Sequence, residues 1–428
     1  MNFLKTTFGS VTFRQSTVTF SATFLNGILG LAFFGLLAQV LGVAAFGLFS
    51  VTIEVLALVA SIADLGTDTG LVKFIGKYRK NDPTEAQKYL KVGLLIKLLV
   101  SLVISIVGWF ASPFLAEFVF QKPELTLGLR LAAIGVATSL LFTFMTAALQ
   151  GFQYFKAWGG LQISTNLLRL LLLIVLGSLA TVNFSEPDLL PQSLIIYISA
   201  PAFGFILGFF FISPSFMKVK GEYGIWKKFL HYNKWVAAFT LIAALSSRLD
   251  IFLAARILDV ESIGLYAAAS RLALVGPQIA TAVGTVIAPK MAEQTTLSSF
   301  LHYFKKVQLM VAGLCVLGLC ALPVSVVLLP IVFGVEFSAS VPIFWVLLVA
   351  MLVFIFSVPV HAAVLYYFSN SKLFFWQAIG HFALIGVLGW YLLSGYGAIG
   401  IAFAVLCGAT FNFIVPTVWL YRKVKVSK

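Results

Sequence analysis

The sequence predicts an all-α polytopic membrane protein, and three observations lead to this fold class. Of the 428 residues, 61% are hydrophobic and only 10% are charged, whereas soluble domains are about 45–50% apolar and about 25% charged. The mean hydropathy is +1.03. The stretches between charge clusters are apolar and about 20 residues long, which is the length of a helix that crosses a bilayer. This composition excludes an ordinary soluble enzyme, a disordered chain and a disulfide scaffold.

The apolar stretches define twelve expected spans. The first follows Lys5 and Arg14, but it is too long for the core of a signal peptide and no small-residue cleavage site follows it. An even number of spans places both termini on the same side of the membrane. The expected spans are residues 16–41, 46–66, 90–112, 128–150, 161–182, 193–216, 234–256, 262–287, 306–329, 340–368, 374–393 and 397–421.

Positive charge is distributed unevenly between the loops. The net charge is +14, from 29 Lys and Arg against 15 Asp and Glu. Most of the basic residues fall in alternate loops, while the opposite loops are short and mainly acidic, with Glu117, Glu186 and Glu336 among them. Because cytoplasmic loops are enriched in Lys and Arg, both termini are predicted to be cytoplasmic. The distribution accounts for the charge without a nucleic-acid partner, and the sequence contains no module typical of nucleic-acid binding.

An internal repeat divides the chain into two halves. Residues 41–50 (LGVAAFGLFS) align without a gap with residues 258–267 (LDVESIGLYA), about half a chain length later. Six spans in each half give the halves the same orientation, which is typical of transporters whose substrate site lies between two lobes. The alternative is that two apolar hairpins share Gly and Leu by chance. The repeat predicts a central cavity between pseudo-symmetric lobes, with an N-terminal lobe at 1–216, a cytoplasmic linker at 217–233 and a C-terminal lobe at 234–428.

Polar side chains inside the expected spans carry the first functional information. A charge at the centre of a span costs about 2.5–3.5 kcal/mol on insertion scales, so such residues usually face an interior cavity. In the second span and in its repeat, small and polar residues recur every three or four positions, which places them on one helix face. Glu54 and Arg271 are equivalent in the two repeats. The two faces comprise Gly47, Ser50, Glu54, Ala57, Ser61, Asp64 and Asp68, and Gly264, Ala267, Arg271, Leu274, Gln278, Thr281 and Thr285.

The deep charges are mainly cationic, and an excess of arginine favours an anionic ligand, because the planar guanidinium fork matches phosphate oxygens. The alternative is that these charges only join helices to one another. A direct pair between Arg248 and Asp250 is not expected, because residues two apart on a helix do not face each other. Candidate substrate contacts are Arg169, Arg248, Arg271, Lys97, Asn26, Gln162, Asn166 and Gln278, and candidate gating or ion-coupling residues are Glu54, Asp64 and Asp250.

Further candidates concern conformational change and catalysis. Gly276 and Pro277 lie beside the charged face and are hinge candidates. His361 and His381 are either hydrogen-bonded contacts between helices or groups that couple transport to protons. We find no metal-ligand spacing, no P-loop and no nucleophile elbow, so no catalytic residue, metal or cofactor is expected. Transport would then draw on an ion gradient, the membrane potential or the substrate gradient.

Several local motifs are similar to those of one transporter family. The chain resembles the polysaccharide-transporter branch of the multidrug/oligosaccharidyl-lipid/polysaccharide (MOP) exporter superfamily, the O-antigen (Wzx-type) flippases. The resemblance extends over the whole chain, although the related lipid II flippases usually have two further spans. The motifs are Leu41-Gly42 with Phe46-Gly47-Leu48-Phe49-Ser50, Asp64-Leu65-Gly66 after the second span, Leu149-Gln150-Gly151 with Phe155 after the fourth, and Arg169 in the fifth.

The resemblance implies a function. Such proteins move an oligosaccharide repeat unit on undecaprenyl pyrophosphate across the inner membrane by alternating access, for O-antigen, lipopolysaccharide or other surface polysaccharides. It implies proton or sodium coupling in some members, and membrane lipids and other glycan-assembly membrane proteins as partners. One alternative is a MATE-like exporter of cationic drugs, which would depend on Glu54 and Asp250. Another is a membrane glycan polymerase, which usually needs a sizeable outer loop.

Overall fold

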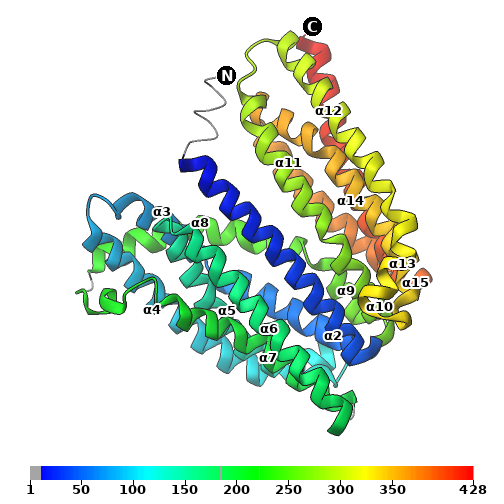
Figure 1. Cartoon of the computed structure of the whole chain (residues 1–428). Coiled ribbons are helices and arrows are strands. Elements are labelled where there is room, and N and C mark those ends of the chain that lie inside the picture. Colours follow the sequence, from blue (N-terminus) through cyan, green and yellow to red (C-terminus); the bar gives the residue numbers. More distant parts are fainter. Residues whose placement is uncertain (1–10, 184–185, 221, 428) are drawn as a thin grey trace. The chain divides into compact units, whose positions relative to one another are not determined.

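The computed structural model describes residues 11–183, 186–220 and 222–427, and within these ranges it contains helices and no strand (Figure 1). Four short helices, the π-helices η1 (Leu115–Val119) and η4 (Ala363–Tyr367) and the 3-10 helices η2 (Pro214–Lys218) and η3 (Val335–Ser340), adjoin the longer ones. The longer helices are α2 (Val11–Ala63), α3 (Thr67–Tyr78), α4 (Pro83–Phe114), α5 (Leu125–Gly151), α6 (Phe155–Asn183), α7 (Glu186–Gly208), α8 (Tyr223–Ser246), α9 (Leu249–Ile257), α10 (Val260–Ala273), α11 (Val275–Ala292), α12 (Leu297–Leu319), α13 (Ala321–Phe333), α14 (Val341–Ala362) and α15 (Ser371–Ser427).

Nine of the described helical segments are long and apolar enough to cross a membrane. Two of these segments, in α2 and α15, each cover two expected spans, because the helix changes direction at a glycine: Gly42 (φ 71°, ψ 175°) in α2 and Gly397 (φ 61°, ψ −144°) in α15. The expected span 234–256 is instead interrupted, since α8 ends at Ser246 and α9 begins at Leu249. The prediction of an all-α polytopic membrane protein is confirmed.

The chain forms two compact units. The first contains Met1–Leu41 and Leu48–Leu245, and the second contains Gly42–Gly47 and Ser246–Lys428. The chain between the sixth expected span and residue 245, which includes α8, therefore packs with the first unit. The short segment Gly42–Gly47 packs with the second unit, although both of its neighbouring segments belong to the first.

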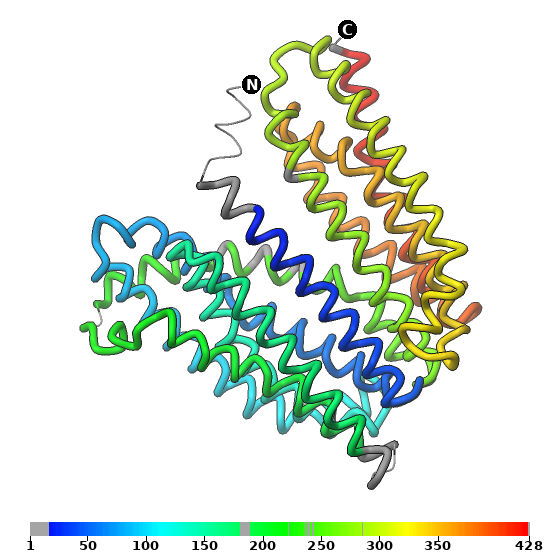
Figure 2. The backbone as a smooth tube through the Cα atoms, viewed as in Figure 1, coloured from blue at the N-terminus to red at the C-terminus, as the bar shows by residue number. Residues whose placement is uncertain are grey.

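In the first unit, α4 to α7 run alongside one another, with α5 packed against α4, α6 and α7 (Figure 2). α3 packs against both α4 and α5. An aromatic cluster attaches α8 to this group, because the ring of Phe229 lies 6.0 Å from the rings of both Phe74 of α3 and Tyr89 of α4. The burial of these three rings explains why α8 belongs with the first unit.

In the second unit, α14 is the central helix and packs against α10, α11, α12 and α15. Its core includes Phe300 of α12, Ile355 of α14 and Ala363 of η4, all buried. The expected span 262–287 is divided into α10 and α11, which meet at Leu274.

Candidate functional site

Four residues that the sequence singled out come together in the first unit. Asn26 of α2 donates from Nδ2 to Oε1 of Gln162 (3.2 Å), and Asn166 donates from Nδ2 to Oδ1 of Asn26. Arg169 donates from Nη1 to Oδ1 of Asn166 (3.1 Å), and its guanidinium lies 4.1 Å from the ring centroid of Tyr197 of α7. We refer to these five residues as the arginine network. Residues 162, 166 and 169 share a face of α6 because they are separated by four and three positions.

The charge of Arg169 is not matched by an acid. Among the residues that the structure describes, Arg169 contacts a neutral amide and an aromatic face, and no carboxylate forms an ion pair with it. Its Nε atom is buried and has no hydrogen-bond partner. Arg169 lies in the middle of the candidate span Phe155–Leu179, where a cation without a counter-charge is costly. A cation–π contact offsets about 0.5–2 kcal/mol of such a cost. Among the described residues, the arrangement therefore leaves the Nε donor of Arg169 unsatisfied.

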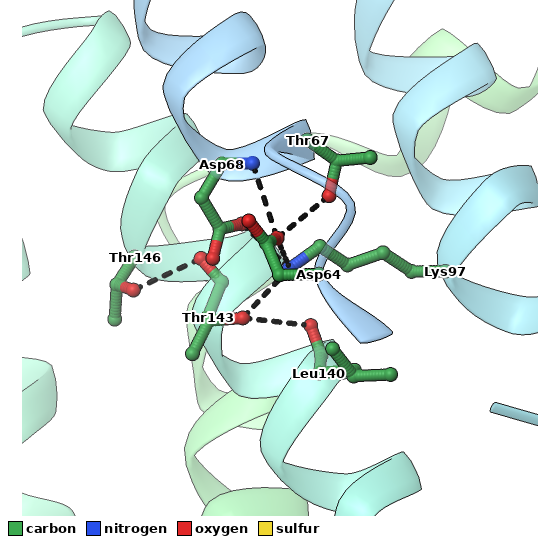
Figure 3. A network of polar contacts seen from close by, with 7 residues as sticks. All are labelled: Asp64, Thr67, Asp68, Lys97, Leu140, Thr143 and Thr146. Carbon is green, nitrogen blue, oxygen red and sulfur yellow. Dashed lines mark hydrogen bonds and ion pairs between the residues drawn. The ribbon is translucent and has the colours of Figure 1, made fainter. Parts of the chain in front are cut away.

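A second group of charges lies where α2 meets α3 (Figure 3). The Lys97 ammonium of α4 lies 2.9 Å from Oδ1 of Asp64 and 2.6 Å from Oδ1 of Asp68, and it donates to Oγ1 of Thr143 of α5 (2.7 Å). The Lys97 side chain is 1% exposed. We refer to these four residues as the lysine cluster. Lys97 is thus paired with two carboxylates, and Asp64 contributes to the same cluster.

The backbone at this junction explains why Asp64 and Asp68 point to the same cation. Leu65 (φ 51°) and Gly66 (φ 71°) both adopt left-handed conformations, which turn the chain sharply between α2 and α3. Asp64 Oδ1 then accepts hydrogen bonds from Oγ1 of Thr67 (2.7 Å) and from the backbone N–H of Asp68 (3.2 Å). Asp64 therefore satisfies donors of the first turn of α3. Asp68 lies outside the candidate spans, and its burial raises its pKa to about 6, although the charge of Lys97 acts in the opposite direction.

In the second unit, Asp250 of α9 accepts a hydrogen bond at Oδ2 from the hydroxyl of Tyr266 of α10 (2.5 Å). Within the described residues, no ion pair joins Asp250 directly to Arg248, in agreement with their separation of two positions. Arg248 lies directly before α9, whereas Asp250 lies in the first turn of this helix. The geometry places Asp250 and Tyr266 together, and the sequence had not indicated Tyr266.

The remaining candidates lie at identifiable places on the helices. Glu54 lies on α2 within the first unit, and Arg271 lies in the last turn of α10 within the second. Gly276, Pro277 and Gln278 lie in the first turn of α11, immediately after the junction with α10. A proline is tolerated in the first turn because its missing N–H has no helical acceptor there. The hinge candidates therefore coincide with a helix junction, and their movement stays a prediction.

His361 makes a structural contact. Pro416 has no N–H, so the carbonyl of Asn412, four residues earlier, lacks its helical donor. This carbonyl accepts from Nε2 of Gln377 (3.0 Å) and contacts Nε2 of His361 (2.8 Å). Both side chains thus replace the hydrogen bond that the proline removes, which favours the first of the two roles considered for His361. The helical proline is the sequence signal for such a site, because the backbone carbonyl four residues before it loses its donor whatever the residue there.

Sequence reasoning missed several partners. Tyr197 and Thr143 were not expected, because nothing in their local sequence indicates which charge they contact. Asp68 lies on the polar face of residues 46–66 and its continuation, but only the turn at Leu65 and Gly66 shows that it shares a lysine with Asp64. Among the described residues, no group of three or more His, Cys, Asp or Glu is placed to hold a metal ion.

Comparison with solved structures identifies the fold. The chain is similar to an inward-facing multidrug resistance MATE transporter of the MOP superfamily (15% identity, 96% of this chain and 98% of that chain, TM-score 0.71). It is similar to the lipid II flippase MurJ in an inward closed conformation (17%, 95% and 87%, TM-score 0.74). It is also similar to a MOP superfamily transporter from Pyrococcus furiosus described as having a binding pocket of reverse polarity (15%, 96% and 95%, TM-score 0.60). At these identities the likeness shows the fold alone.

Comparison of sequences identifies the family. No curated protein sequence matches the chain. The family model of polysaccharide biosynthesis proteins matches residues 13–295, which is more than half of the chain. The resemblance found in the sequence is therefore confirmed at the level of the family. The chain belongs to the polysaccharide biosynthesis protein family, and its fold is that of the MOP superfamily transporters to which it is similar.

Proposed function

We propose that this protein is a flippase for polyprenyl-pyrophosphate-linked oligosaccharides. It moves a repeat unit from the cytoplasmic to the outer leaflet by alternating access, and the product is used for surface polysaccharide synthesis. The family supports a polysaccharide precursor as the substrate, and the MurJ-like fold is compatible with a lipid-linked one. The observation that carries the proposal is Arg169, a cation inside a candidate span for which the described residues offer no carboxylate.

The proposal includes a topology. Twelve spans form two pseudo-symmetric lobes of six helices around a central cavity, in the inner membrane. Both termini are cytoplasmic. The repeat of residues 41–50 in 258–267 and the uneven distribution of Lys and Arg between loops support this arrangement. The kinks at Gly42 and Gly397 support two spans in each of α2 and α15.

The arginine network is proposed to hold the pyrophosphate. The planar guanidinium of Arg169 can donate two parallel hydrogen bonds to phosphate oxygens. Asn26, Gln162 and Asn166 orient the guanidinium and offer amide groups to sugar hydroxyls. In the second unit, Arg248, Arg271 and Gln278 are the proposed substrate contacts, while Glu54, Asp64 and Asp250 are proposed to act in gating or in proton or sodium coupling. Lys97 is already paired with two carboxylates, so we assign it to the lysine cluster.

The test compares variants of Arg169 with a matched arginine. Arg169→Ala should abolish glycan export and weaken binding of a polyprenyl-pyrophosphate glycan, measured by native mass spectrometry, by about tenfold or more. Arg169→Lys keeps the charge but loses the fork, so we expect an intermediate effect. The control is Arg130→Ala, because Arg130 also lies over an aromatic ring, 5.4 Å from the centroid of Trp109. Full export and unchanged glycan binding in Arg169→Ala would contradict the proposal.

A MATE-like exporter of cationic drugs is the second candidate. The observation that favours it is the carboxylate of Asp250, which the hydroxyl of Tyr266 positions inside the second unit. This candidate predicts that a lipophilic cation binds to the protein and that Asp250→Asn or Glu54→Gln abolishes the binding. The flippase predicts that neither change affects binding of the pyrophosphate glycan as strongly as Arg169→Ala does.

A further inference from the structure

One end of the first unit carries a concentrated positive charge. α4 and α6 begin at this end, and α5 and α7 end there, so four candidate spans leave the membrane at this end. The chain that joins them here, residues 71–91, 152–156 and 209–234, contains twelve Lys and Arg but only three Asp and Glu. At the opposite end, residues 115–124 between α4 and α5 contain one Lys and two Glu. The first unit is therefore strongly polarised along its spans.

Two amphipathic helices present this charge to the outside. α3 and the first three turns of α8, residues 223–234, each bury an apolar face in the core of the unit and leave the opposite face exposed. The buried faces include Leu71, Phe74 and Ile75 of α3, and Ile225 and Phe229 of α8. We refer to the exposed basic side chains as the basic face, which consists of Lys73, Lys77, Lys227, Lys228, His231 and Lys234.

The lysines of the two helices belong to one surface. The Lys73 ammonium of α3 lies 3.5 Å from the ring centroid of Tyr232 of α8. A Cβ atom on Gly70 would clash with Oδ1 of Asn233, so glycine at this position allows α3 and α8 to approach closely. Contacts between the side chains of the two helices thus hold the basic face together within the first unit.

The acids at this end are used elsewhere. The sequence of α8 contains no Asp or Glu, and the one acid of α3, Asp68, pairs with Lys97. Lys88 lies 3.5 Å from Glu85 and 2.6 Å from Glu222, while Asp82 caps α4. The basic face therefore keeps a net positive charge, and it is suited to a partner that carries negative charge.

Apolar side chains interrupt the basic face. Tyr223 is 83% exposed and Leu230 is 47% exposed, and both lie on α8 beside the lysines. Helices that lie in the headgroup layer combine lysine with exposed aromatic and aliphatic side chains, because the cations contact phosphates while the apolar groups enter the acyl boundary. An acidic protein would match the charge, but it would not explain why this surface lies at the end of four candidate spans.

We propose that the basic face binds the phosphates of anionic phospholipids in the leaflet at this end of the first unit. The bound lipids hold α3 and the start of α8 against the headgroup layer. Each lysine near an anionic leaflet strengthens binding about fivefold. The inference concerns resident lipids and not the transported glycan, so it does not rest on the proposed substrate.

Two lipids with the same acyl chains test the site. Dioleoyl phosphatidylglycerol, which is anionic, and dioleoyl phosphatidylcholine, which is zwitterionic, are titrated separately into delipidated protein and the bound lipids are counted by native mass spectrometry. Phosphatidylglycerol should bind about tenfold or more tightly. Combined replacement by Lys77→Gln, Lys227→Gln and Lys228→Gln should reduce its affinity to that of phosphatidylcholine. Unchanged phosphatidylglycerol affinity in this triple glutamine variant would overturn the proposal.

Two matched variants separate a site from a general effect of charge. Lys77→Arg, Lys227→Arg and Lys228→Arg together keep the charge and should keep the affinity for phosphatidylglycerol. The second control removes the same number of exposed lysines from α11 and α12 of the second unit, and it should also keep the affinity. Its changes are Lys290→Gln, Lys305→Gln and Lys306→Gln. An equal loss in this control would show that the lipid responds to net charge alone, which would overturn the site.

A glycan titration distinguishes this site from the proposed substrate site. The triple glutamine variant should bind a polyprenyl-pyrophosphate glycan as the unmodified protein does, whereas Arg169→Ala should not. Loss of glycan binding in the triple glutamine variant would assign the basic face to the substrate and overturn the resident-lipid site. If the glycan binds to none of these proteins while phosphatidylglycerol binds as expected, the proposed substrate is wrong and the lipid site is supported.

Thermal unfolding in detergent at two salt concentrations provides an independent measurement. Phosphatidylglycerol should raise the unfolding temperature of the unmodified protein but not that of the triple glutamine variant, because a ligand of the folded state stabilises it. The shift should shrink between about 0.1 M and about 1 M NaCl, since the Debye length falls from about 10 Å to about 3 Å. A shift that does not change with salt would indicate binding through the acyl chains and overturn the proposal. Displacement of the lipid by an equimolar amount of poly-glutamate would also overturn it, in favour of an acidic protein partner.

Discussion

Asp68 shows how one buried residue can make the stability of this protein depend on pH. Its carboxylate shares the ammonium of Lys97 with Asp64, so two acids face one cation. Burial raises the pKa of Asp68 to about 6. Burial also acts to raise the pKa of Asp64, but the charge and hydrogen bond of Lys97 leave it lowered, so titration of Asp64 falls below the pH range in which Asp68 changes charge.

The sign of the effect follows from the two states of Asp68. An unfolded aspartate titrates near pH 4, so between about pH 4 and about pH 6 the folded protein binds a proton that the unfolded chain has lost. Stability should therefore increase as the pH falls through this window, and Asp68→Asn should remove this dependence. Thermal unfolding in detergent at several pH values measures it. Asp82→Asn, at the exposed N-cap of α4, is the matched control and should behave as the unmodified protein does. An unaltered pH profile in Asp68→Asn would contradict the assignment.

At the scale of the element, the two repeats begin their helices in different ways. Gly42 turns the chain with a positive φ, whereas its counterpart Asp259 caps α10 with its side chain. Asp259 Oδ1 accepts from the backbone N–H of Ser262 (2.8 Å), and Oδ2 accepts from the hydroxyl of Ser262 (2.9 Å). These hydrogen bonds lower the pKa of Asp259. The same topology is thus built from different local chemistry.

Loss of this cap should destabilise the second unit. Asp259→Ala removes both acceptors, and we expect a cost of about 1 kcal/mol. Because the folded pKa lies below the unfolded value, the contribution of the charged cap is present above about pH 4 and is lost as the pH falls through the lower folded pKa. Asp259→Asn retains an acceptor and should cost less at neutral pH. Thermal unfolding of the three proteins at neutral pH provides the comparison, and equal transitions for Asp259→Ala and the unmodified protein would show that the cap contributes nothing.

At the scale of the whole molecule, topology is the property that the loop charges predict. The proposed arrangement places Tyr223 in a cytoplasmic loop and Val335 in an outer one. Both side chains are well exposed, at 83% and 80%, so each should react when it faces the reagent. The three native cysteines, Cys315, Cys320 and Cys407, are first replaced by serine. In intact cells, a membrane-impermeant maleimide should label Val335→Cys and not Tyr223→Cys in this cysteine-free background, and both should react after permeabilisation. The reverse pattern in intact cells would invert the proposed topology.

The sequence by itself determined the properties that depend on composition and on helical period. The membrane-spanning helices follow from apolar length, and the arginine network follows in part from the spacing of Gln162, Asn166 and Arg169 on one helix face. Asn26 was recognised for the same reason, as a polar residue in an apolar span. These signals are properties of short sequence segments, so they can be recognised without knowledge of the tertiary structure.

Only the tertiary structure decided how distant segments share partners. The pairing of Lys97 with two aspartates depends on the left-handed turn at Leu65 and Gly66 and on the packing of α4 against α3. The packing of Gly42–Gly47 within the second unit depends on a close approach between Gly47 and Gly264, and nothing in either segment alone predicts that the two meet. The physical reason is that a residue's period and polarity determine its helix and face, whereas its partner is determined by which backbones approach closely enough to pack.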